Sequence, residues 1–259
     1  MRTEAGLLYI YNKILNTNFL KLNMMKKILI TAAVLLIISL GSFGQTKRAL
    51  IIAIGNYDYE KNGWRPISAL NDVPLIQTAL EKQNFPVANI KTLTDEMATR
   101  AGIEKALDDL IKSAGTGDIV VVHISSHGQQ LEDDNVSEEM DGLDEAIVPY
   151  GATYSSDKSV FNKVAAGYFR DDVFGEKVTQ LRNKLGKNGD VLVSIDACHS
   201  GCGTRGGVAL ARGNNSPMVS DNFAKKKLPA KDAAGVFKEN TRTKLSPNSA
   251  TYVVISGAQ

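Results

Sequence analysis

The sequence predicts an α/β domain in which helices cover both faces of a mostly parallel β-sheet. Buried apolar runs rich in β-branched residues alternate with segments of helical apolar spacing, and parallel neighbours need such crossovers. With 259 residues, 43% hydrophobic and 22% charged, the chain is long enough for a sizeable core. Its two cysteines are too few for a fold built on disulfides.

Residues 1–44 are interpreted as a leader before the folded domain. Residues 24–27 read MMKK, an apolar run follows from Ile28 to Leu40, and small residues stand at Ser42 and Gly44. This order is typical of a signal peptide, which we assign to residues 24–44. The apolar run is shorter than the roughly 20 residues of a membrane span. We therefore expect export to the periplasm or medium and a mature domain over residues 45–259, without a stable membrane anchor.

The charge balance argues against nucleic acid or an anionic membrane as the partner. The chain has 30 Lys and Arg and 28 Asp and Glu, a formal charge of +2. Five of these basic residues lie in residues 1–44 with a single acidic one, so the remainder is nearly neutral. Without a field of one sign, function must come from local chemistry.

Five apolar runs are the expected strands, in chain order. They are residues 49–54, 90–93, 118–124, 191–195 and 251–255. The run at 49–54 is continuously apolar and the run at 118–124 is rich in β-branched residues, as strands buried on both faces are.

Three helices are expected between these strands. Asn71 and Asp72 precede a segment with Pro74 in its first turn and apolar residues at helical spacing. Thr99 offers an N-cap for a second helix, and a third is expected around residues 173–185. Residues 202–248 are rich in Gly, Asn, Lys and Ser without periodicity, so we expect a flexible, exposed linker there.

A thiol and an imidazole follow two of the predicted strands. The run at 118–124 passes into SSHGQ, which contains His127, and the run at 191–195 passes into DACHSG, which contains Cys198. Functional residues of an open parallel sheet gather beyond the carboxyl ends of its strands. We predict Cys198 as nucleophile and His127 as general acid and base. The N–H groups of Gly128 and Cys198 are the predicted donors to the oxyanion.

Other interpretations of these residues stay open at this point. A single Cys or His at a strand end is more often structural, and His123 alternates with the core-facing residues of its strand. Cys198, His199 and Cys202 could bind a metal, although no fourth ligand is near. A disulfide between Cys198 and Cys202 would silence the nucleophile.

Three motifs, in this order, resemble the caspase-like cysteine peptidases and especially the metacaspases and their bacterial relatives. They are SSHGQQ at 125–130, DGLDEAIVP at 141–149 and DACHSG at 196–201, after LIIAIGNY at 50–57. The resemblance runs from about residue 47 to 201 and returns weakly at 252–257. It implies a caspase-like three-layer α/β/α fold and peptide hydrolysis by a dyad of Cys198 and His127.

The resemblance also implies protein or peptide substrates with Arg or Lys before the scissile bond. Metacaspases have an acidic pocket for that residue, and the motif match assigns it to Asp72, Asp196 and Ser125. The chemistry agrees, because a half-buried carboxylate pair is costly unless a cation neutralises it. The alternative for Asp72 is a charge at a helix terminus.

Calcium dependence is implied only in part. Asp171 and Asp172 match an acidic pair that binds Ca²⁺ in metacaspases, and Asp144 matches a third ligand. No acidic residue follows the nucleophile closely, and the pair could instead be a solvated helix cap. The dyad itself requires no cofactor, so Ca²⁺ is expected only as an activator.

The resemblance leaves the end of the chain and the activity open. The family continues past the last strand, so either the C-terminal part of the fold is truncated here or another chain supplies it. Arg205 and Arg212 lie in the linker, where an acidic pocket would favour self-processing. The alternatives are a catalytically silent caspase-like module that binds basic peptides or a partner, and a different cysteine hydrolase on this scaffold.

Overall fold

A computed structural model describes residues 45–134, 142–197, 216–223 and 243–256, together with residues 13, 21 and 24–30. The chain divides into two compact units, Met1–Gly44 and Gln45–Gln259. In the first unit, residues 24–30 are helical and exposed. Among the described residues, no helix combines the length and the apolar character needed to cross a membrane.

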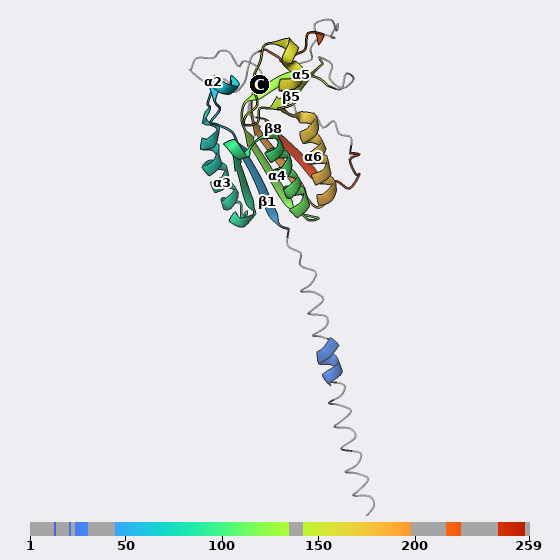
Figure 1. The fold of residues 1–259 in the computed structure, drawn as a ribbon. Helices are drawn as coiled ribbons and strands as arrows, with labels where there is room; N and C mark the ends of the chain where they lie inside the picture. Colours follow the sequence, from blue (N-terminus) through green and yellow to red (C-terminus); the bar gives the residue numbers. More distant parts are fainter. Residues whose placement is uncertain are drawn as a thin grey trace, which may run out of the picture. The chain divides into compact units, whose positions relative to one another are not determined.

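A five-stranded sheet with the order β2-β1-β3-β7-β8 forms the centre of the second unit (Figure 1). Its strands are β1 (Lys47–Ala53), β2 (Ile90–Thr94), β3 (Ile119–Ser125), β7 (Asp190–Asp196) and β8 (Thr251–Ser256). All four neighbouring pairs are parallel. The predicted α/β class and its five strands are confirmed.

Helices cover both faces of the central sheet. α4 (Arg100–Ser113) and α6 (Asp171–Leu185) lie side by side on one face (Figure 1), and α3 (Asp72–Lys82) packs on the other. Thr99 Oγ1 accepts a hydrogen bond from the N–H of Gly102 at 3.1 Å, which confirms the predicted cap of α4. Asn71 makes no side-chain capping bond, because the 3₁₀ turn η1 (Ser68–Asn71) runs directly into α3.

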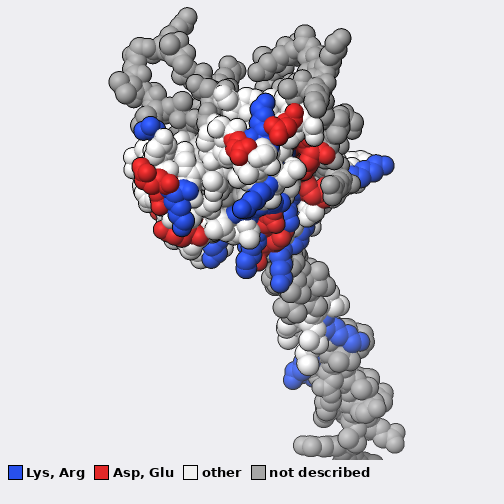
Figure 2. Space-filling model, turned by 45° about the horizontal axis from the view of Figure 1, so that its top comes forward, with Lys and Arg blue, Asp and Glu red and all other residues white. Residues whose placement is uncertain are grey.

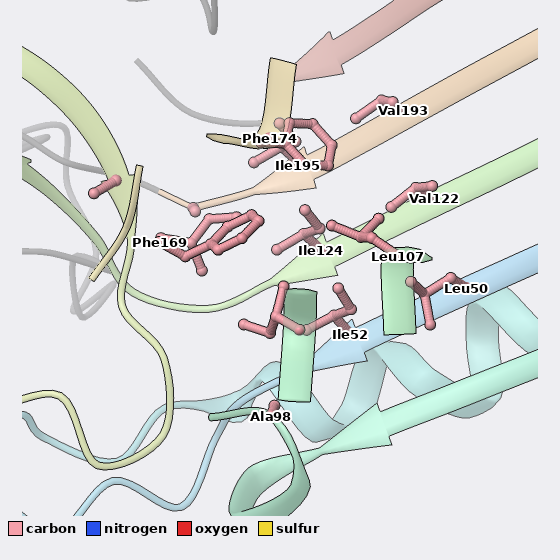
Figure 3. Packing of buried hydrophobic residues seen from close by; sticks show 14 of the residues in the cluster. Leu50, Ile52, Ala98, Leu107, Val122, Ile124, Phe169, Phe174, Val193 and Ile195 are labelled. Carbon is pink, nitrogen blue, oxygen red and sulfur yellow. The ribbon is translucent and has the colours of Figure 1, made fainter. Parts of the chain in front are cut away.

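Alternate residues of the strands fill two cores, one on each face. Leu50 and Ile124 point toward α4 and α6, where Phe174 of α6 belongs to the same cluster (Figure 3). Ile51 belongs to the opposite cluster and packs with Leu80 of α3. Because successive side chains of a strand point to opposite faces, burial on both faces explains why these runs are continuously apolar.

A second, smaller sheet adjoins the carboxyl end of the central one. Its order is β4-β5-β6 and both pairs are antiparallel. Its strands are β4 (Gly128–Glu132), β5 (Leu143–Ile147) and β6 (Phe169–Arg170). The remaining elements are α2 (Tyr59–Asn62), α5 (Phe161–Ala165), η2 (Val87–Asn89), η3 (Asp95–Met97) and η4 (Lys158–Val160). This sheet was not predicted, because its strands are short and rich in polar residues.

Part of the predicted linker contacts the domain. Met218 is buried, its N–H donates to the Gln130 carbonyl, and its own carbonyl accepts from the Glu132 N–H, both at 2.9 Å. A parallel bridge joins Met218 to Leu131. The described residues around Met218 therefore add a short extended segment beside β4, a contact that hydrophobic periodicity does not reveal.

Charged side chains of both signs are mixed on the face of the molecule seen in Figure 2. Acidic and basic groups alternate there without a large patch of either sign.

Candidate active site

His127 lies at the carboxyl edge of the central sheet, two residues after the end of β3. It is buried, and Ser126 between it and the strand donates its N–H to the Asp196 carbonyl of β7 at 3.2 Å. β3 and β7 pair in parallel, with Ser125 opposite Asp196. The strand that leads to His127 and the strand that leads to Cys198 are thus neighbours, as predicted.

The nucleophile predicted at Cys198 lies outside the described residues, and so do His199 and Cys202. Gly128, the other predicted oxyanion donor, is the buried first residue of β4. His123 is buried within β3, and its Nδ1 lies 3.3 Å from Ser194 Oγ of the neighbouring strand. This placement within the sheet agrees with the structural role expected for His123.

One hydrogen bond assigns the protons of the His127 ring. Its Nε2 lies 2.7 Å from the carbonyl oxygen of Arg65. A carbonyl oxygen can only accept, so Nε2 carries the proton and the lone pair of the neutral ring is on Nδ1. Nδ1 is therefore the nitrogen that can take up a proton, as a general base must.

Two aromatic rings fix the orientation of this imidazole. The ring centroids of Tyr57 and Trp64 lie 4.8 Å and 5.0 Å from that of His127. The Tyr57 hydroxyl also accepts a hydrogen bond from the backbone N–H of His127 at 3.3 Å, and it donates to the Val148 carbonyl at 2.7 Å. Packing and hydrogen bonding together restrict the ring to one plane.

The loop that presents Arg65 is anchored at the end of β1. The Ile67 N–H donates to the Gly55 carbonyl at 2.9 Å, and a Cβ at position 55 would lie 2.9 Å from the Ile67 oxygen. Glycine permits this close approach of two backbones. Asp95 Oδ1 accepts from the N–H groups of Gly55 and Asn56 at 2.9 Å and 3.0 Å.

Sequence reasoning missed Tyr57, Trp64 and Arg65 as parts of the site. Arg65 contributes its backbone carbonyl, which no side-chain pattern can reveal. The available signal was two large aromatic residues in the loop after a strand that ends in Gly-Asn, close to the predicted catalytic edge.

The three residues predicted to bind the substrate come together at the same edge. Ser125 Oγ donates to Asp72 Oδ2 at 2.5 Å, and Ser125 pairs in register with Asp196. Both aspartates are half-buried, whereas Ser125 is fully buried. Asp72 also stands in the first turn of α3, so its interpretation as a helix-terminus charge holds as well.

The acidic residues predicted as calcium ligands lie near one another, because the charge of Asp172 acts on both Asp144 and Asp171. Asp144 of β5 groups with Asp133 and Asp134. One carboxylate oxygen from each of the three residues lies within 4.8 Å of the other two. Oxygen donors of this kind suit a hard cation such as Ca²⁺. Two of these carboxylates are already engaged, because Arg170 Nη1 pairs with Asp144 and Arg170 Nε lies 3.7 Å from Asp134.

Asp171 and Asp172 are the first two residues of α6. Asp171 is buried, and its Oδ1 accepts from the Asp172 N–H at 3.0 Å. Burial raises the pKa of Asp171 to about 9, and the negative charges of Glu145 and Asp144 add to this. Burial also raises the pKa of Asp144 to about 7, against the lowering effect of Arg170. Asp171 is therefore a buried acid and not part of a solvated cap.

Comparison with known proteins identifies relatives among the metacaspases. Metacaspase-4 of Arabidopsis thaliana is 34% identical over 162 residues, which make up 60% of this chain and 34% of that protein. Metacaspase-1A of Aspergillus oryzae is 30% identical over 249 residues, 83% of this chain and 54% of that protein. The chain thus spans from about a third to about half of the length of these relatives.

A solved structure and a family model extend this comparison. The crystal structure of protein GSU0716 from Geobacter sulfurreducens has a TM-score of 0.52 and 22% identity, covering 83% of this chain and 73% of its own, and so shares the fold. The family model described as Caspase domain matches residues 46–259. Since that match takes in nearly the whole second unit, the chain belongs to the caspase domain family of peptidases, family C14.

Proposed function

We propose that the protein is a cysteine endopeptidase that cleaves after Arg or Lys. The observation that carries this is the placement of His127, with its Nδ1 lone pair, beside the end of the strand that leads to Cys198. His127 and Cys198 are 71 positions apart, the same separation as between paired residues of β3 and β7. Continuing the pairing of the two strands would therefore set the two residues opposite each other.

In the proposed reaction, His127 Nδ1 takes the proton of the Cys198 thiol, and the thiolate attacks the scissile carbonyl carbon. The C–N bond then breaks as the imidazolium gives its proton to the leaving amine, which leaves a thioester. Water, deprotonated by His127, attacks the thioester and restores the thiol. The N–H groups of Gly128 and Cys198 are the proposed donors to the oxyanion.

The Arg or Lys preference is supported by charge at the catalytic edge. The Ser125 hydroxyl donates to Asp72, and Asp196 is the residue opposite Ser125 on the neighbouring strand, so two acidic residues lie at this edge. A guanidinium or ammonium group between two half-buried carboxylates would form charge-assisted hydrogen bonds with both. An acidic substrate side chain would be repelled.

Calcium is proposed as an activator and not as a participant in the chemistry. Asp133, Asp134 and Asp144 are the residues that would hold it. Bound there, the ion would supply positive charge that draws the three carboxylates together. The catalytic steps above need only the side chains of the dyad.

Two processing events complete the proposal. Self-cleavage is proposed after basic residues of the linker such as Arg205 and Arg212, both outside the described residues. Removal of the leader before Gln45 on export is proposed from the signal-peptide pattern. Mapping the termini of the purified and the secreted protein by mass spectrometry tests both.

Hydrolysis of fluorogenic peptides that end in Arg, Lys or Asp tests the main proposal. The full chain should cleave after Arg and Lys but not after Asp, and Cys198→Ala should be inactive. Asp72→Asn and Asp196→Asn should each lower kcat/KM for the Arg peptide at least about tenfold, since a charge-assisted bond is lost. Cleavage after Asp would overturn the pocket, and peptide binding without hydrolysis would indicate the silent module.

A further inference from the structure

Arg170 lies beside the acidic cluster of the second sheet, which consists of Asp133, Asp134 and Asp144. It ends β6, opposite Ala146 of β5, and only 12% of its side chain is exposed. Its Nη1 pairs with Asp144 and donates to the Glu132 carbonyl at 3.1 Å, and its Nε lies 3.7 Å from Asp134. The guanidinium thus reaches β4, β5 and the start of the loop after β4.

The cluster needs a positive charge because its carboxylates are buried. Asp144 is among the most buried acidic residues of the described chain, and Asp133 and Glu145 are buried near it. A buried carboxylate without a counter-charge is strongly unfavourable. Arg170 supplies such a charge. The N–H groups of its planar guanidinium face the carboxylates of Asp144 and Asp134 and the carbonyl of Glu132.

A divalent cation would have to use the same carboxylates. The oxygen set that suits Ca²⁺ comes from Asp133, Asp134 and Asp144, and Arg170 already pairs with the last two. We propose that Arg170 is a built-in counter-cation, and that Ca²⁺ occupies this cluster only by displacing the Arg170 guanidinium. The proposal rests on the calcium site described under the proposed function but not on peptidase activity.

Hydrogen bonds of Glu132 connect Arg170 to the described part of the linker around Met218. Arg170 holds the Glu132 carbonyl, while the Glu132 N–H and carboxylate hold the segment around Met218: the N–H donates to the Met218 carbonyl at 2.9 Å and Oε2 accepts from the Ser220 N–H at 2.8 Å. Release of Glu132 would therefore act on the residues that follow the proposed cleavage region. Ca²⁺ binding would in this way be coupled to the linker.

Calorimetry with Ca²⁺ alone tests the proposal, in the full chain carrying Cys198→Ala so that neither catalysis nor self-cleavage contributes. Arg170→Gln should bind Ca²⁺ at least tenfold more tightly than the parent, and Ca²⁺ should raise its Tm more than that of the parent. Arg170→Lys, which keeps the charge without the fork, should lie between the two.

Arg48→Gln is the matched control. It removes another partly buried Arg–Asp pair, with Asp118, remote in the fold from the second sheet, and should leave the Ca²⁺ affinity unchanged. Equal affinities of the parent and Arg170→Gln, or absence of Ca²⁺ binding in both, would overturn the proposal. If Arg170→Gln fails to fold, Arg170→Lys takes its place. A Ca²⁺ affinity of Arg170→Lys equal to that of the parent would then overturn the proposal.

Discussion

The carboxyl edge of the central sheet and the second sheet place their polar side chains by different means. At the edge, His127 is oriented by a backbone carbonyl and two aromatic rings. In the second sheet, Asp144 is buried against the charge of Arg170. The first arrangement depends on packing and neutral hydrogen bonds, whereas the second depends on charge and should respond to pH and to ions.

The largest contrast is between two histidines of one chain segment. His127→Ala should lower kcat/KM for an Arg peptide by about 10³-fold, because it removes the proposed base. His123→Ala, the control, removes a buried ring within the sheet and should lower Tm while keeping most of the activity per folded molecule. Steady-state kinetics with active-site titration separates the two effects. Equal losses of activity in both variants would contradict the assignment.

Core packing gives the next contrast, between an inner and an outer strand. Ile124 of β3 is fully buried, whereas Ile255 of β8 is 55% exposed. Ile124→Ala should lower the free energy of unfolding by about 2–5 kcal/mol, because it leaves a cavity. Ile255→Ala should cost well under half as much, since much of its surface already meets solvent. Urea unfolding measures both, and similar losses would contradict the described burial.

The acidic residues of the second sheet predict a pH effect at Asp171, the first residue of α6. Its pKa of about 9 in the folded state lies above the usual value of 3.8, so between these values the native state binds more protons than the unfolded one. Its contribution to stability is therefore complete below about pH 4 and is lost as pH rises toward 9. Asp171→Asn should become more stable relative to the wild type as pH rises from 5 to 9.

Asp157→Asn is the control for this series. Hydrogen bonds from Ser159 lower the pKa of exposed Asp157, so it is ionised throughout this range in both states. Thermal unfolding at a series of pH values should show a slope relative to wild type for Asp171→Asn only. A flat difference for Asp171→Asn would show that the native state does not hold this extra proton.

The smallest contrast compares two helix starts. Thr99→Ala removes the capping bond to Gly102 and should destabilise the protein by about 1 kcal/mol. Asn71→Ala should cost less, since the Asn71 side chain makes no capping bond to α3. Equal losses, measured by chemical unfolding, would contradict the assigned caps.

The inner strands β1 and β3 of the central sheet could be predicted because they are buried on both faces. A continuous apolar run such as residues 49–54 leaves few alternatives, and the parallel arrangement follows from the helices expected between the strands. The grouping of Asp72, Ser125 and Asp196 was predicted from the resemblance to the metacaspases, and the structure places the three residues at one edge of the sheet.

The second sheet and the support of His127 could not be predicted in the same way. β4 and β5 read GQQLE and LDEAI, patterns without a clear apolar period. Arg65 acts through its backbone, and Asp95 accepts from N–H groups some 40 positions away, so both depend on tertiary contacts. The grouping of Asp133 with Asp144 likewise depends on the pairing of β4 and β5.

The central claim, that His127 activates Cys198, is tested most directly by the rate at which Cys198 reacts with iodoacetamide at neutral pH. In a Cys202→Ser background the chain has one thiol, so the rate reports Cys198 alone. Alkylation should slow at least about tenfold in His127→Ala but not in His123→Ala, because only His127 stabilises the thiolate. The same rate in all three proteins would contradict the claim.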